Sequence, residues 1–247
     1  MITLGQAPAT RIPQPRMRIL VVQNFEDTGL GQIATALDEK NAVVTIVQAH
    51  LGEPLPAAAG YDGLIVLGGG QNALDDEGSP WFPELLGLMR NFVDSDRATL
   101  GVCLGSQLLA RAYGADNLIG AASEFAWREV ELTEDGREDA VLGGLPERFP
   151  VFQWHDDTFT LPRRGERLAG NLDAHNQAFR IGRAGYGIQF HFEADRKLVR
   201  QWNDTFAGWL AERQPGWPQR HEREAALHGP AADAAGLAIA RAWVAVV

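Results

Sequence analysis

The chain has 247 residues, which is typical of one large domain rather than two full ones, and its 45% hydrophobic, 9% aromatic and 22% charged residues exclude disordered, collagenous and low-complexity classes. Its net charge of −10 argues against a nucleic-acid surface. No apolar stretch approaches the roughly 18 residues of a membrane span, and no signal-peptide pattern opens the sequence. We therefore expect a cytoplasmic protein whose partners are small molecules or other proteins, without nucleic acid or membrane.

The first predicted elements alternate between strand and helix. Met1 to Arg16 contains three prolines without apolar periodicity, which predicts an unstructured leader. Arg18 to Val22 is a short apolar run typical of a buried parallel strand. Thr28 is the candidate N-cap of an amphipathic helix, which is predicted from the spacing of Leu30, Ile33, Ala34 and Leu37.

Two more apolar strands, at 42–47 and 63–67, and a second helix continue this alternation. The second of these strands ends in Gly68-Gly69-Gly70. The helix is predicted from the spacing of Leu85, Leu88, Met89 and Phe92. This order predicts a three-layer α/β fold with a doubly wound, mostly parallel sheet, whose ligand crevice lies at the carboxyl ends of the strands.

The pattern changes in the second half of the chain. Partial alternation at 127–132 and 149–154 predicts added antiparallel strands. Asp195 is the expected cap of a helix that buries Leu198, Trp202, Phe206 and Trp209. Residues 215–247 predict a C-terminal helical extension with an apolar stripe of Leu237, Ala240, Val244 and Val247. Packing of this stripe on the domain is favoured, and a homodimer contact is the alternative.

Cys103 is the single cysteine of the chain, so it can form neither an internal disulfide nor a cysteine-based zinc site. It lies between Gly101 and Gly105, after an apolar strand and before a helical run. Such a sharp strand-to-helix turn needs small neighbours and places the sulfur at a helix N-terminus, where a thiolate is favoured. A cysteine that only packs needs neither glycine, so we interpret Cys103 as a nucleophile. No metal and no cofactor are expected.

His191 and Glu193 follow an apolar strand at positions i and i+2, so both side chains should leave the same side of it. His191 can then take the proton of Cys103 and return it to a leaving group, while Glu193 holds the imidazole in place. The alternative is a strand-end histidine paired with a carboxylate without a catalytic role. Beside the Cys103 turn, the catalytic interpretation is favoured.

The Gly68-Gly69-Gly70 turn is the third candidate element of a catalytic site. The backbone N–H groups of Gly69 and Gly70, together with that of Leu104, could stabilise the oxyanion of a tetrahedral intermediate. On its own, the pattern is equally typical of a simple turn or of a phosphate cradle. The residues that follow lack the spacing of a dinucleotide-binding fingerprint.

Taken together, these three elements resemble the class I glutamine amidotransferase family, in which a Gly-rich turn, a Gly-x-Cys-x-Gly elbow and a His-x-Glu strand end occur in this order. The resemblance covers Arg18 to Trp209 and implies a flavodoxin-like domain over 17–214. Other strings resemble a stand-alone subgroup similar to the glutaminase domain of GMP synthase: Pro80-Trp81, Glu124 with Trp127, Val151 to His155 with Asp157 to Phe159, and Asn176 to Arg180.

The resemblance implies that Cys103 attacks a γ-carboxamide and that water then hydrolyses a γ-glutamyl thioester, with release of glutamate and of ammonia or an amine. By position it also implies that Gln107, His155 and Asp157 lie on the substrate side. For His155 and Asp157, a hydrogen bond that orders the loop is an equal alternative. Trp154 and Phe159 are expected to be core aromatics.

The sequence departs from the family pattern at Gln71-Asn72 and at Asp156, both where the substrate should lie. The acyl donor can therefore be free glutamine or a γ-glutamyl peptide. A Gly-x-x-x-x-Gly-Lys phosphate loop is absent from the sequence, so use of the ammonia would require a separate synthase subunit. The alternatives are a redox-sensing protein and a catalytically inactive binding protein on the same fold.

Overall fold

The computed structural model describes residues 16–247, so the predicted leader lies outside the described residues except for Arg16. Five strands of the described part are mutually parallel: β1 (Arg18–Gln23), β2 (Val43–Gln48), β3 (Gly63–Val66), β4 (Ala98–Val102) and β11 (Gly185–Ile188). Their order in the sheet is β2-β1-β3-β4-β11, so the chain changes sides of β1 between β2 and β3. Doubly wound sheets bind ligands at such a switch point, beyond the carboxyl ends of the strands.

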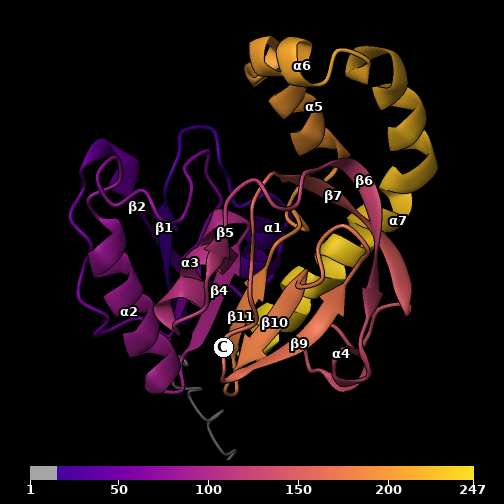
Figure 1. The fold of residues 1–247 in the computed structure, drawn as a ribbon. Coiled ribbons are helices and arrows are strands. Elements are labelled where there is room, and N and C mark those ends of the chain that lie inside the picture. The colour runs from indigo at the N-terminus through magenta and orange to yellow at the C-terminus, as the bar shows by residue number, and fades with distance from the viewer. Residues whose placement is uncertain (1–15) are drawn as a thin grey trace, which may run out of the picture.

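The rest of the sheet is antiparallel and continues from β11 in the order β10 (Ala178–Ile181), β9 (Gly165–Gly170), β6 (Glu124–Leu132) and β7 (Arg148–His155). Trp127 pairs with Phe152, which confirms the antiparallel addition predicted from the alternating residues. A small separate sheet joins β5 (Asn117–Leu118) to β8 (Thr158–Phe159). The predicted doubly wound α/β fold with added antiparallel strands is thus confirmed (Figure 1).

Helices cover both faces of the parallel strands and complete the three layers. One face packs against α1 (Gln32–Glu39) and α7 (Trp217–Ala245), and the other against α2 (Phe82–Asp94) and α3 (Leu104–Ala112). In β1, Ile19 and Val21 face the first pair of helices, whereas Leu20 and Val22 face the second. A strand that is buried on both faces needs apolar residues throughout, which explains this unbroken run.

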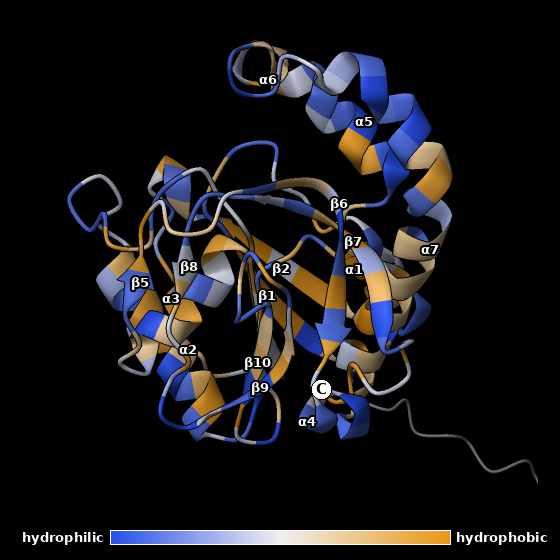
Figure 2. Ribbon diagram, turned by 45° about the vertical axis from the view of Figure 1, so that its right-hand side comes forward, coloured by the Kyte–Doolittle hydropathy of each residue, from blue (hydrophilic) through white to orange (hydrophobic). Residues whose placement is uncertain are grey.

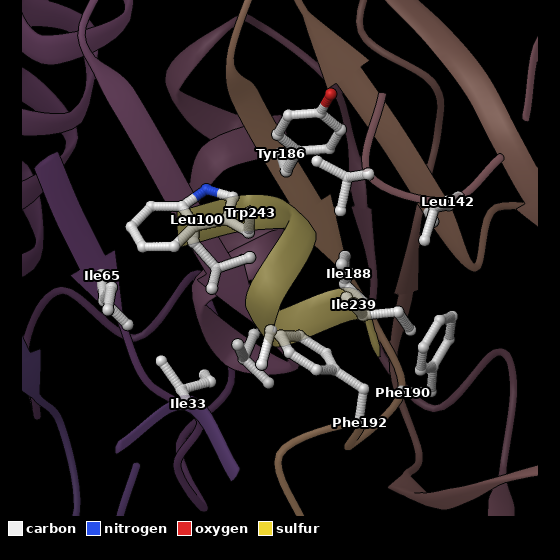
Figure 3. Packing of buried hydrophobic residues seen from close by; sticks show 14 of the residues in the cluster. Ile33, Ile65, Leu100, Leu142, Tyr186, Ile188, Phe190, Phe192, Ile239 and Trp243 are labelled. Carbon is white, nitrogen blue, oxygen red and sulfur yellow. The ribbon is translucent and has the colours of Figure 1, made fainter. Parts of the chain in front are cut away.

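The C-terminal helix α7 packs deep in the core that it shares with the parallel strands. Figure 3 shows Ile239 and Trp243 among side chains of the sheet and of α1. The buried stripe differs from the predicted one, because Ala240 and Val244 are buried but Leu237 is only half-buried. Packing on the domain, the favoured interpretation of the stripe, therefore accounts for its buried members.

Two short helices, α5 (Arg196–Thr205) and α6 (Ala207–Arg213), form what we call the arm. Asp195 caps α5 as predicted, since its carboxylate accepts a hydrogen bond from Leu198 N at 2.8 Å. The predicted single helix through Trp209 is wrong, because α5 ends at Thr205 and is followed by Phe206, whose ring packs against Trp154 with centroids 5.4 Å apart. Figure 2 shows the arm as a mainly hydrophilic projection beyond the sheet.

The start of α1 also differs from the prediction. Thr28 is not its cap; the Thr28 hydroxyl donates a hydrogen bond to Phe25 O at 2.7 Å, and the capping position belongs to Gly31. Gly31 has φ 48°, and a Cβ there would lie 2.0 Å from Glu193 O. Only glycine allows this approach, which ties α1 to the loop after β11.

Two further short elements lie at the surface, α4 (Glu134–Glu138) and a 3₁₀ turn at Ala49–Leu51. Within residues 16–247, none of the helices combines the length and apolar character that crossing a bilayer requires.

Candidate active site

Cys103 lies at a sharp turn between β4 and α3. Its backbone has φ 50° and ψ −110°, a strained conformation for a residue other than glycine, and its N–H donates to Ile188 O at 2.8 Å. A Cβ on Gly101 would lie 2.3 Å from Gly105 O, and a Cβ on Gly105 would lie 2.1 Å from Val66 O. Both glycines are therefore required by close backbone contacts, as the elbow interpretation of the sequence expects.

The loop after β11 brings His191 and Glu193 together. His191 Nδ1 lies 2.7 Å from Glu193 Oε1, and both side chains are buried. His191 is three residues beyond the end of β11, and its N–H donates to Phe152 O at 2.9 Å. From α1, Gln32 N donates to Glu193 O at 2.9 Å, and the Gln32 amide side chain donates to Phe192 O at 3.1 Å. The pair is therefore held by backbone contacts on both sides.

The charge state of His191 is set by its two neighbours. Burial alone would lower its pKa, but the negative charge of Glu193 and the nearby Cys103 sulfur outweigh burial and raise the pKa well above 6.5. The imidazole is therefore a stronger proton acceptor than a free histidine. A base of this kind beside a sulfur is what activation of a cysteine nucleophile requires.

The glycine turn after β3 lies against both groups. A Cβ at Gly68 would lie 3.4 Å from Cys103 Cβ and 3.4 Å from His191 Cε1. Gly69 and Gly70 follow and line a cavity with Cys103 and Leu104, the first residue of α3. The structure therefore places all three backbone segments of the predicted oxyanion site at one end of this cavity, next to the positive end of a helix dipole.

The predicted substrate-side residues line the same cavity, which has a volume of about 440 Å³. Gln107 lies on α3, and its amide donates to Gln189 Oε1 at 3.2 Å. His155 Nδ1 lies 2.9 Å from Asp157 O, and the Asp157 carboxylate accepts from Gly120 N at 2.7 Å. His155 and Asp157 thus make the loop-ordering contacts of the alternative interpretation and also face the cavity.

A buried carboxylate behind His155, that of Glu124, was not predicted as part of the site, and neither were its polar partners. Glu124 is 4% exposed; its Oε2 lies 3.2 Å from His155 Nε2, and its Oε1 accepts from Asn171 at 2.7 Å. Gln177 also donates to this carboxylate. This arrangement depends on β6 pairing with β7, which sets Glu124 opposite His155. In the sequence, Glu124 stands out only as part of a family string, because strand pairing cannot be read from local spacing.

Five aromatic side chains that contact one another ring to ring also line the cavity: Phe25, Trp154, Trp202, Phe206 and Trp209. The prediction of a core position is correct for Phe159, which is 1% exposed, but Trp154 is only partly buried and lines the cavity. We call these five residues the aromatic wall. Three of them belong to the arm: Trp202 lies in α5, Phe206 between the two helices and Trp209 in α6. The predicted single helix buried these rings, so it did not predict the aromatic wall.

The described residues 16–247 contain no grouping of three or more His, Cys, Asp or Glu side chains that could hold a metal ion. The cavity and the residues behind it bring together a sulfur, an imidazole with its carboxylate, and backbone amides. This arrangement can carry out nucleophilic attack on a carbonyl, with proton transfer and oxyanion stabilisation.

Known proteins resemble this chain over most of its length. YfeJ, a glutamine amidotransferase-like protein of Salmonella typhimurium, is 28% identical over 182 residues, which cover 72% of this chain and 75% of YfeJ. One of the subunits of the glutamine-hydrolysing GMP synthase of Methanoculleus marisnigri is 33% identical over 59% of this chain and 72% of its own length. The match to the longer GMP synthase of Aeropyrum pernix covers only 29% of that protein.

Structural similarity agrees with these sequence matches. The crystal structure of a glutamine amidotransferase from Thermotoga maritima superposes with a TM-score of 0.80 at 28% identity, covering 94% of this chain and 97% of the other. The sequence model described as glutamine amidotransferase class-I matches residues 21–201, a segment that contains Cys103, His191 and Glu193. The chain therefore belongs to the class I glutamine amidotransferase family.

Proposed function

We propose that this chain hydrolyses the γ-amide of glutamine or of a γ-glutamyl compound, with Cys103 as the nucleophile. His191 accepts the proton of Cys103 and later gives it to the departing nitrogen, and Glu193 orients His191. The observation that carries the proposal is the glycine turn at Gly68, which lies in contact range of both Cys103 and His191. One carbonyl group can then meet sulfur, imidazole and backbone amides at the same time.

The steps follow from these positions. Cys103 Sγ attacks the amide carbon, and the N–H groups of Gly69, Gly70 and Leu104 stabilise the resulting oxyanion. Collapse of this intermediate breaks the C–N bond, and the protonated His191 supplies the proton that the leaving ammonia or amine takes. Water, deprotonated by His191, then attacks the γ-glutamyl thioester, which releases glutamate and restores the thiol.

The glutamyl group has candidate partners on the polar side of the cavity. We assign its α-amino and α-carboxylate groups to Gln107 and to the loop that carries His155 and Asp157. The buried Glu124 keeps this loop in place through His155. These residues would therefore hold the α end of the glutamyl group and present its γ-amide to Cys103.

The fate of the ammonia distinguishes two forms of this function. Relatives named as single subunits of GMP synthases support delivery to a separate synthase chain, whereas a γ-glutamyl compound as substrate would make the protein a self-contained hydrolase. Glutamate release separates the two forms. Release from glutamine alone identifies an amidotransferase that serves a synthase, and release from γ-glutamyl peptides identifies the hydrolase.

The test compares the wild-type chain with Cys103→Ala, which removes one sulfur from a site whose backbone remains in place. We expect Cys103→Ala to lose at least about 10³-fold in glutamate release, with an unchanged thermal midpoint. Mass spectrometry of the wild type mixed with substrate should detect the thioester. Residual hydrolysis near the wild-type rate in the variant would contradict the proposal, as would a wild type that neither turns over nor reacts with a glutamine-like alkylating agent.

A further inference from the structure

The cavity at Cys103 is lined by two kinds of residue. Glycines, Gln71, Asn72 and the loop of Asp156 and Asp157 supply backbone and polar groups, and the aromatic wall supplies rings. Its volume of about 440 Å³ falls in the range of roughly 300–1,000 Å³ that holds drug-sized ligands. The cavity therefore has room for a group beyond the glutamyl moiety that the proposed function requires.

The position of His191 decides which end of a substrate meets the aromatic wall. The departing nitrogen must lie within hydrogen-bond reach of His191, because this residue supplies its proton. The His191 ring packs edge-to-face against Trp202, with centroids 5.2 Å apart. A group attached to the departing nitrogen therefore leaves the reacting centre beside Trp202.

From Trp202 the aromatic surface continues outward without interruption. The Trp202 ring centroid lies 5.9 Å from that of Trp154, which in turn lies 5.4 Å from Phe206 and 5.2 Å from Trp209. Trp202 is fixed, since its indole N–H donates to Asp27 O at 3.3 Å. Trp154, Phe206 and Trp209 are only partly buried and line the cavity, so part of their ring surface is open to a ligand.

The sequence of the arm makes this surface unusual. Most side chains of α5 are charged or amide-bearing, and only Val199 and Trp202 are buried in it. Trp202 belongs to a buried cluster, and Phe206 and Trp209 pack against this cluster while they also line the cavity and stay only partly buried. Partly open aromatic faces of this kind bind apolar and aromatic groups by burial and stacking.

We propose that the aromatic wall is a leaving-group subsite, and that the preferred substrates are γ-glutamyl amides of amines that carry an aromatic or large apolar group. This inference rests on the proposed function. Cys103 Sγ attacks the γ-carbonyl, the C–N bond breaks, and the amine departs with the proton from His191 along the aromatic wall. Water then releases glutamate, so no further reactant is required.

The test uses two probes that differ only in the leaving amine, γ-glutamyl-phenethylamide and γ-glutamyl-ethylamide. We expect the wild type to prefer the phenethylamide in kcat/KM by about 10-fold or more, the size of effect that an apolar contact of this area produces. Trp209→Ala and Phe206→Ala should each reduce this preference several-fold, and Trp209→Phe should retain most of it. Leu227→Ala, an exposed apolar residue of α7 outside the cavity lining, is the matched control and should leave the preference unchanged.

Binding to Cys103→Ala, measured by calorimetry, gives a readout that does not depend on turnover. The phenethylamide should bind this variant about 10-fold more tightly than the ethylamide, and Trp209→Ala in the same background should remove the difference. Equal affinities and equal kcat/KM values would overturn the subsite while leaving glutamine hydrolysis intact. Loss of all Cys103-dependent turnover with the binding difference retained would overturn the proposed function and keep the subsite.

Discussion

The parallel half of the sheet and the arm contribute to the same cavity in different ways. The parallel half positions Cys103 and His191 through backbone contacts so close that single glycines are required, as at Gly105 against Val66 O. The arm contributes side chains, Trp202, Phe206 and Trp209, on short helices that project from the sheet (Figure 1). The reacting groups are therefore fixed by main-chain geometry, whereas the arm contributes to the cavity through its side chains, of which Trp202 packs against His191.

The largest effect on stability and activity is expected for Gly105→Ala, at the backbone contact that fixes Cys103. Gly105→Ala would place a Cβ 2.1 Å from Val66 O, so β3 and α3 must separate. We expect a loss of about 3 kcal/mol or more in the free energy of unfolding, together with loss of glutamate release. Chemical denaturation measures the first and an activity assay the second.

Gly208→Ala in α6 is the matched control, because nothing lies within 4 Å of the added methyl and helices favour alanine. It should leave the free energy of unfolding unchanged or raise it slightly. Equal losses for both variants would show that the elbow is no more constrained than the arm.

The next effect concerns the proton. His191→Asn removes the group that we expect to move a proton between Cys103 and the leaving nitrogen, so kcat/KM should fall by about 10²-fold or more. Glu193→Gln keeps a hydrogen-bond acceptor beside Nδ1 but removes the charge, so its loss should be smaller. The measurement is glutamate release at several pH values. If His191→Asn retained the wild-type rate, the imidazole would have only a structural role.

A smaller effect contrasts two buried histidines. Burial tends to lower the pKa of His191, but Glu193 and Cys103 raise it above 6.5. In contrast, burial lowers the pKa of His221, which stacks on Trp127 and meets Trp217 edge-to-face, despite the opposing charge of Glu222. Arg200 also lowers the pKa of His221, and Glu224 raises it. The two histidines therefore contribute to stability with opposite dependence on pH.

The signs follow from proton linkage. The raised pKa of His191 stabilises the fold fully below the unfolded pKa near 6.5, and this contribution is lost as the pH rises through the folded value. The lowered pKa of His221 stabilises the fold above about 6.5, and this contribution is lost as the pH falls through the folded value. His221→Phe should flatten the acid side of a plot of unfolding free energy against pH, and His191→Asn the alkaline side. A plot unchanged by either variant would contradict these assignments.

The features that the sequence predicts correctly are those determined by residues close together in the chain. The buried run of β1, the glycines around Cys103 and the Asp195 cap each depend on neighbours within a few positions. The same holds for the pairing of His191 with Glu193, two residues apart. Local sterics and capping chemistry are sufficient to predict such features.

The parts that could not be predicted depend on distant segments. Glu124 meets Asn171 and Gln177 only after β6 has paired with β7 and β9. No proline stands at Phe206 to predict the helix break there. At the break, the Phe206 ring contacts the rings of Phe25 and Trp154, which are distant in the sequence. The aromatic wall depends on the helix break, which places Phe206 and Trp209, and on the pairing of β6 with β7, which places Trp154. Its position at the cavity therefore could not be predicted from neighbouring residues.

The close packing of α7 has a consequence for where the functional unit of this chain ends. The family match stops at residue 201, yet a Cβ at Gly236 would lie 2.1 Å from Phe192 O, in the loop that carries His191 and Glu193. The last helix is thus the backing of that loop, although it lies beyond the segment by which the family is identified. A chain shortened to the family boundary would keep every residue of the predicted triad and lose the surface that holds two of them in place.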